Sequence, residues 1–165
     1  KLNGIVYQEY HNFLGNSVLK ELKNPENLNL VKLEKQFDVP RRRVDYNNDL
    51  IKKLKIFFMN SKITNALAKK FNTELQFDSV DIWIDKPGYY LKPHTDDSRI
   101  KLAIQIYLGE DENVGTALFN KDNNVLKTFE YKLNSGYALL NTKNSFHGVD
   151  KIEKDGRISL YVRYC

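Results

Sequence analysis

Two histidines and an aspartate have the types and spacing of a metal site. His94 and Asp96 stand two apart, and side chains two apart in an extended strand point to the same side. His147 follows 51 residues after Asp96, and Arg157 follows ten residues after His147. Two imidazoles and one carboxylate with open coordination positions suit non-haem Fe(II), and Zn²⁺ accepts the same ligand types. Because the guanidinium of Arg157 has a fork geometry that matches a carboxylate, the four residues predict a metal centre with an anion site.

The surrounding sequence resembles the Fe(II)/2-oxoglutarate-dependent oxygenases, and within them the prolyl-4-hydroxylase-like branch. The resemblance spans residues 78–164 and is carried, in the family's order, by Gly88–Asp96, Ile106–Leu108, Gly115–Thr116, Gly136–Ala138, Phe146–Val149 and Gly156–Ser159. It implies an enzyme, a dioxygenase that takes Fe(II), 2-oxoglutarate and O2, with ascorbate as an optional reductant. Such an enzyme hydroxylates a C–H bond and releases succinate and CO2. The resemblance and the arginine together favour iron over zinc.

The resemblance assigns iron binding to His94, Asp96 and His147, and it assigns the distal carboxylate of 2-oxoglutarate to Arg157. Ser159 lies two residues after Arg157, so its hydroxyl shares one face of a strand with the guanidinium. The resemblance also implies that Tyr107 hydrogen-bonds this carboxylate. Many relatives carry a tyrosine nine or ten positions before the first ligand, where this chain has Asp85 and Ile84. We expect substrate contacts instead from Trp83, Tyr89, Tyr90 and Arg163.

Three readings of function remain open. The first is a hydroxylase of a peptidyl residue, with proline or another amino acid as the leading substrate, or of a small molecule. The second is an oxidative demethylase of nucleic acid from the same superfamily, favoured by the net charge of +5, the Arg41–Arg43 cluster and the spacing of Arg157 and Arg163. The ten-residue gap between His147 and Arg157 fits the hydroxylases better. The third is a non-catalytic β-barrel binding module, against which the intact set of ligands argues.

The elements that must position these residues are mainly strands. After residue 76 apolar and polar residues alternate, as they do in half-buried strands. The predicted strands are 80–85, 102–108, 116–119, 125–131, 137–141, 145–149 and 157–164. One face of each is aliphatic and the other is too polar for a dry core, so we predict a mainly β (α+β) fold. The resemblance implies a double-stranded β-helix, that is, a jelly roll or cupin-like barrel.

The N-terminal part has a different pattern. We predict an opening strand at 4–7, a helix over 12–23, a solvated loop at Arg41–Arg43, and two helices within 48–71, the second capped by Ser61. Helices that precede a run of strands are expected to cover the outside of one sheet. The organisation predicted is one domain, 1–165, with mostly helical support over 1–75 and the catalytic core over 76–165.

Composition narrows the class of protein. Of the 165 residues 41% are apolar and 28% charged, as in ordinary globular domains. No apolar run is long enough to span a bilayer and no signal peptide is visible, so we expect a cytoplasmic monomer without membrane contact. The one cysteine is Cys165, which excludes an internal disulfide and suits a reducing compartment.

Overall fold

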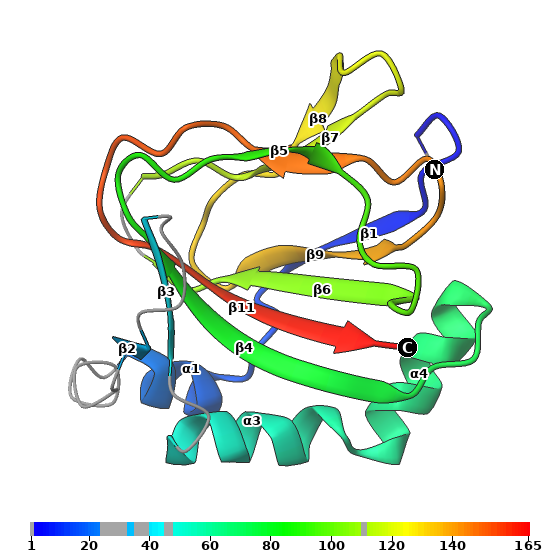
Figure 1. Ribbon diagram of the computed structural model, residues 1–165. Helices are drawn as coiled ribbons and strands as arrows, with labels where there is room; N and C mark the ends of the chain where they lie inside the picture. The colour runs from blue at the N-terminus through cyan, green and yellow to red at the C-terminus, as the bar shows by residue number, and fades with distance from the viewer. Residues whose placement is uncertain (1, 24–32, 35–39, 45–47, 110–111) are drawn as a thin grey trace.

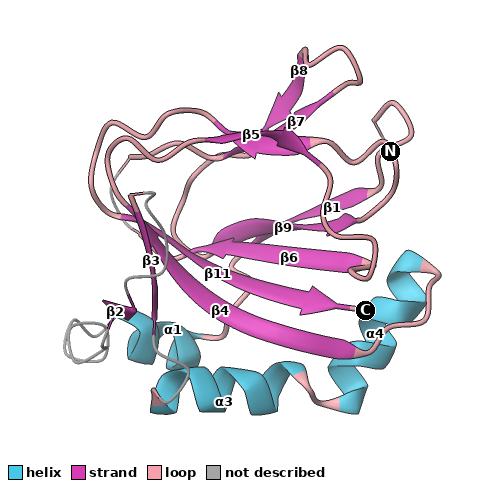
Figure 2. Ribbon diagram, in the orientation of Figure 1, coloured by secondary structure: helices cyan, strands magenta, loops and turns pink. Residues whose placement is uncertain are grey.

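The computed structural model describes residues 2–23, 33–34, 40–44, 48–109 and 112–165. The strands within these residues form two antiparallel sheets (Figures 1 and 2). The larger sheet contains, in spatial order, β1 (Tyr7–His11), β9 (Ser135–Leu140), β6 (Leu102–Tyr107), β11 (Arg157–Tyr164), β4 (Phe77–Asp85), β3 (Arg41–Val44) and β2 (Leu33–Glu34). The smaller sheet contains β5 (Leu91–His94), β10 (His147–Val149), β7 (Thr116–Phe119) and β8 (Val125–Thr128). The prediction of a mainly β fold is therefore confirmed.

One face of the larger sheet packs against helices α1 (Asn16–Lys23), α3 (Asp49–Phe58) and α4 (Ser61–Phe71). In Figure 1 these helices lie on one side of that sheet and the smaller sheet lies on the other. Every second residue of β11 joins this core, and Leu160 and Val162 are fully buried there. The helices contribute Leu50, Ile51, Leu54, Phe58, Leu67 and Phe71 to the same cluster. Apolar burial of this extent is the main force that holds the helices on the sheet.

The opposite face of the larger sheet is polar. Along β11 the alternate residues Arg157, Ser159, Tyr161 and Arg163 point away from the helices, because successive side chains of a strand point to opposite faces. Arg157 and Ser159 have no exposed surface at all. A buried polar layer of this kind must be satisfied by partners inside the protein or by a ligand.

The N-terminal elements differ from prediction in their bounds. The opening strand is Tyr7–His11 and not 4–7, since Leu2 and Ile5 close a tight turn in which Gly4 has a positive φ of 81°. Helix α1 begins at Asn16 and not at Asn12, because Asn12 has a φ of 55°, which an α-helix does not allow.

Helices α3 and α4 match the predicted pair, but the predicted cap of α4 was wrong by one residue. The side chain of Asn60 accepts a hydrogen bond from the backbone N–H of Lys62 at 2.9 Å, so Asn60 is the N-cap and Ser61 is the first helical residue. In the described residues, none of the helices has the length and apolar character needed to cross a membrane.

The prediction of a solvated loop at Arg41–Arg43 was wrong. These residues form β3, which pairs with β4. Arg41 and Arg43 are partly buried, whereas Arg42 is exposed. The two inward-facing arginines pair with aspartates of β4, Arg41 with Asp85 at 2.7 Å and Arg43 with Asp81 at 3.7 Å. The basic run therefore belongs to the sheet, where aspartates on a neighbouring strand, 44 and 38 residues away in sequence, balance two of its charges.

Candidate metal centre

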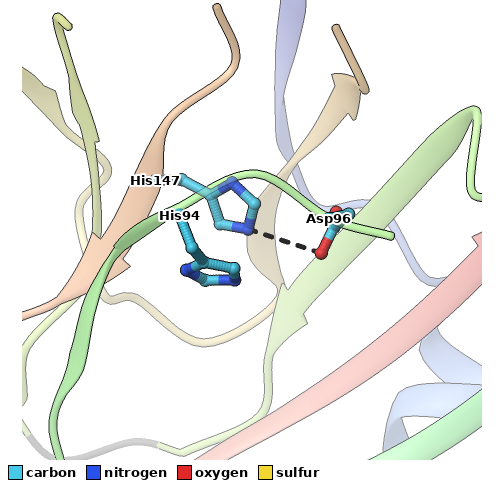
Figure 3. Close-up of side chains that lie close together, drawn as sticks. All are labelled: His94, Asp96 and His147. Atoms are coloured by element: carbon cyan, nitrogen blue, oxygen red, sulfur yellow. Dashed lines mark ion pairs between the residues drawn. The ribbon is translucent and has the colours of Figure 1, made fainter. Parts of the chain in front are cut away.

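The two histidines come from neighbouring strands of the smaller sheet. His94 ends β5 and His147 begins β10, and the antiparallel register places them directly opposite one another. Their ring centroids are 4.4 Å apart. Asp96 lies two residues beyond the end of β5, so the extended strand assumed for the spacing of His94 and Asp96 ends at His94. Figure 3 shows Asp96 facing the imidazole of His147, with its Oδ1 at 3.7 Å from Nε2.

One ligand atom from each of these three residues lies within 4.8 Å of the other two. The backbone orients both rings, because Nδ1 of His94 lies 3.0 Å from the carbonyl oxygen of Lys92 and Nδ1 of His147 lies 3.0 Å from that of Ser145. A carbonyl only accepts, so each Nδ1 carries the proton and each Nε2 keeps its lone pair. Metal-binding histidines in proteins have this arrangement.

The surroundings of His147 favour the metal-binding form of its imidazole. Burial lowers the pKa of His147, while Asp96 and the Ser145 carbonyl act in the opposite direction. The neutral imidazole is the form that binds a metal. The donor set of two imidazole nitrogens and one carboxylate therefore fits Fe(II).

Asn141 connects the two loops that carry the ligands, and sequence reasoning missed it. Its side-chain amide nitrogen lies 3.2, 3.0 and 2.8 Å from the carbonyl oxygens of Asp96, Asp97 and Ile100. Its amide oxygen accepts from the hydroxyl of Ser145 at 3.1 Å. One side chain thus holds the turn that carries Asp96 against the segment that leads to His147. No local pattern distinguishes this asparagine from the chain's many others.

A cavity of about 150 Å³ opens beside the ligands. It lies between the sheets and is lined by Arg41, Trp83, Leu91, His94, Asp96, Ala103, His147, Tyr161 and Arg163. Among the predicted substrate residues, Trp83 and Arg163 line this cavity. Tyr89 does not: it is 4% exposed and packs against Val149 and Ile152. Tyr90 is 57% exposed and lies outside the lining.

Tyr161 lines the cavity, although sequence reasoning gave it no role in the site. The alternation along β11 signals it, because it stands between Ser159 and Arg163 on the polar face. Burial raises the pKa of its phenol, against the opposing effect of Arg41 and Arg157. The hydroxyl therefore stays protonated and available as a hydrogen-bond donor at the cavity wall.

Arg157 is fully buried, but its partners belong to the protein. Its Nη1 pairs with Oδ2 of Asp85, its Nε donates to the carbonyl of Val114 at 2.7 Å, and its Nη2 lies 3.4 Å from Oγ1 of Thr116. Burial by itself lowers the pKa of Arg157, but Asp85 and nearby tyrosines raise it above its ordinary value. The guanidinium therefore stays charged and already holds a carboxylate.

The two other residues predicted to bind 2-oxoglutarate lie on the same polar face. The hydroxyl of Tyr107 accepts from the backbone N–H of Thr116 at 2.8 Å, and its ring centroid is 5.8 Å from Cζ of Arg157. Oγ of Ser159 is buried and has no hydrogen-bond partner among the described residues. A buried orphan hydroxyl beside an arginine fits a carboxylate ligand. These residues can bind 2-oxoglutarate only if Asp85 releases the guanidinium of Arg157.

Comparison with known proteins gives a consistent result at the level of fold. No protein-family profile matches the sequence, and no curated protein sequence matches it. Solved structures do match. One is an oxidoreductase of the 2OG-Fe(II) oxygenase family from Burkholderia pseudomallei, with a TM-score of 0.74 and 15% identity over 98% of this chain and 84% of that one.

Two further similar structures are prolyl hydroxylases. The enzyme from Trichoplax adhaerens, in complex with a hypoxia inducible factor oxygen degradation domain peptide fragment, has a TM-score of 0.70 and 16% identity over 96% of this chain and 82% of its own. The viral collagen prolyl hydroxylase of Paramecium Bursaria Chlorella virus-1, in a 2OG complex, has a TM-score of 0.65 and 15% identity over 99% and 97% of the two chains. The chain therefore has the fold of the 2OG-Fe(II) oxygenases, and the enzymes that it resembles in structure include prolyl hydroxylases.

Proposed function

We propose that this protein is an Fe(II)- and 2-oxoglutarate-dependent dioxygenase that hydroxylates a C–H bond of a peptidyl proline or another amino-acid residue. The observation that carries the proposal is the convergence of His94, Asp96 and His147, with both Nε2 atoms directed by backbone carbonyls and all three ligand atoms within 4.8 Å of one another. We also propose that the two sheets are the halves of a double-stranded β-helix, whose mouth is the cavity beside these ligands.

The protein residues supply position and charge in this scheme. His94, Asp96 and His147 would hold the iron and leave coordination positions open toward the cavity. Bound iron and 2-oxoglutarate would supply the oxidation, in which O2 is divided between succinate and the hydroxylated product while CO2 is released. Arg157 would hold the distal carboxylate, with Ser159 as an additional donor.

The cavity lining favours a substrate with both apolar and polar parts. Trp83 and Leu91 offer apolar walls, and Tyr161 and Arg163 offer donors for backbone carbonyls or an anionic group. A peptide substrate is also supported by the Trichoplax adhaerens enzyme, whose structure contains a peptide. Arg41 and Arg43 point inward, and each pairs with an aspartate. Two of the charges that favoured nucleic acid are therefore already balanced within the protein. We therefore rank nucleic-acid demethylation second.

The test is co-substrate turnover. Purified protein with Fe(II) and 2-oxoglutarate is expected to release succinate, and a proline-containing peptide should increase the rate and gain the mass of one oxygen atom. A His147→Ala variant should lose this activity, whereas the matched variant His11→Ala should keep it, because His11 is exposed and lies outside the cavity. Iron-independent succinate release, or equal loss in both variants, would contradict the proposal. Turnover with a methylated oligonucleotide but no peptide would favour the second function.

A further inference from the structure

Asp85 stands between two arginines in the larger sheet. The register places Arg41 of β3 and Arg157 of β11 directly opposite it on either side. Oδ2 of Asp85 pairs with Nη1 of Arg157, and Oδ1 lies 2.7 Å from Nε of Arg41. The side chains of Asp85 and Arg157 are fully buried, and that of Arg41 is 16% exposed. The carboxylate of Asp85 is therefore bound to the guanidinium of Arg157, the one fully buried arginine among the described residues.

The charges around Asp85 are unbalanced. Two guanidinium groups and one carboxylate leave one net positive charge in a largely buried position, where an uncompensated charge is costly. A second carboxylate would neutralise the group. Asp85 would keep an ionic partner in Arg41 if it released Arg157.

A hydrogen-bond donor for a second carboxylate is also present. Ser159 follows Arg157 on the same face of β11, and its buried Oγ has no partner among the described residues. A buried hydroxyl without a partner costs free energy, which an incoming carboxylate would recover. The arrangement thus combines an arginine that already binds a carboxylate with a buried hydroxyl that has no partner among the described residues.

We propose that Asp85 is an internal competitor for the co-substrate: its carboxylate holds the place on Arg157 that the distal carboxylate of 2-oxoglutarate takes, and when 2-oxoglutarate binds it releases Arg157 and keeps Arg41 as its ionic partner. This inference rests on the proposed function. It makes Asp85 a residue that sets co-substrate affinity. The opposing interpretation is that Asp85 is a permanent cross-link between strands and that Arg157 never binds a ligand.

Asp85→Asn separates the two interpretations. The amide keeps the size of the side chain and one acceptor oxygen, but it removes the competing charge. We expect 2-oxoglutarate to bind this variant about tenfold more tightly or better. In the wild type the ligand has to replace the Asp85 carboxylate on Arg157, whereas in the variant it replaces only a neutral amide. The affinity for 2-oxopentanoate, which has the same chain length but no distal carboxylate, should stay within about twofold of the wild-type value.

Asp81→Asn is the matched control. Asp81 lies on the same strand and face, and it also stands between two arginines, with Arg163 at 2.7 Å and Arg43 at 3.7 Å. Neither of these holds the distal carboxylate in the proposed function. Asp81→Asn should therefore leave the affinity for 2-oxoglutarate unchanged. A gain in both variants would indicate a general charge effect and would overturn the proposal.

Arg41→Gln gives a second, opposite test that keeps Asp85, and unchanged affinity for 2-oxoglutarate in this variant would overturn the proposal. Asp85 then has no alternative partner and holds Arg157 more firmly, so 2-oxoglutarate should bind about tenfold more weakly. The double variant Asp85→Asn/Arg41→Gln shows whether this effect passes through Asp85, because the loss disappears only in that case. A loss that persists in the double variant would mean that Arg41 contacts the ligand directly.

Binding can be measured without turnover. Titrations use the 165-residue chain with Mn(II) in place of Fe(II). Trp83 reports on binding, since it is the one tryptophan of this chain, lines the cavity and has its ring centroid 4.3 Å from Cζ of Arg41. Calorimetry provides the same constants independently. If wild-type protein turns over 2-oxoglutarate but Asp85→Asn binds it no more tightly, the proposed function stands and this inference is wrong. If no variant binds 2-oxoglutarate, both are wrong.

Discussion

Metal binding should stabilise this fold by a predictable amount, and His147 is the residue on which that gain depends. The three ligands are assembled only in the folded chain, because His147 is brought beside His94 by strand pairing across 53 residues of sequence. A metal that binds only the folded state adds about 2.7 kcal/mol when its free concentration is 100 times its dissociation constant. For a chain of this length each kcal/mol raises the melting temperature by about 2–4 °C. Saturating Fe(II) should therefore raise the melting temperature by about 5–10 °C.

The assay is thermal unfolding without oxygen, with and without Fe(II), followed by addition of a chelator. His147→Ala leaves two of the three candidate ligands, so the affinity for the metal should fall and the metal-dependent gain should drop to about a third of the wild-type gain or less. His11→Ala is the matched control and should keep the full gain. An equal gain in wild type and His147→Ala would show that iron binds elsewhere, and the assignment of the metal centre would be refuted.

Three further predictions concern the scaffold. Phe58→Ala should lower the free energy of unfolding by about 3–5 kcal/mol, because this side chain has no exposed surface; Phe57→Ala, 44% exposed in the same helix, should cost less than about 1 kcal/mol in urea titrations. Asn141→Ala should weaken Mn(II) binding about tenfold or more, measured by calorimetry, because it releases the loop that carries Asp96; Asn144→Ala, exposed nearby, should not. Burial raises the pKa of Tyr164 to about 12. That value lies above the pKa of about 10 that tyrosine has in an unfolded chain. The protonated phenol therefore contributes its full stabilisation below about pH 10 and loses it as the pH rises toward 12. The free energy of unfolding of Tyr164→Phe should depend less on pH across that window than that of the wild type.

A large part of the fold could be predicted from local patterns. Alternation with a period of two correctly predicted the long strands β4, β6 and β11 and the separation of an apolar face from a polar one. Helical spacing predicted α3 and α4. Such patterns are reliable because they follow from the geometry of each element and need no information about its neighbours.

Local patterns did not determine which side of an element is covered. Phe57 and Phe58 both belong to the predicted apolar stripe of α3, yet only Phe58 is fully buried. Arg41–Arg43 has the composition of a solvated loop, yet pairing with β4 makes it a strand. In each case the outcome depends on an element distant in the chain, whose position one segment's composition does not encode.

The sequence by itself determined the chemistry that this protein offers: the types of the three candidate ligands, their order along the chain, and the presence of an arginine and a serine two apart on one strand face. Only the tertiary structure decided how these groups are used. It paired Arg157 with Asp85 across 72 residues and placed Asn141 between the two loops that carry the ligands. The physical reason is that side-chain type and alternation are local properties, whereas the partner of a buried charge is set by strand register, which forms only when the whole sheet assembles.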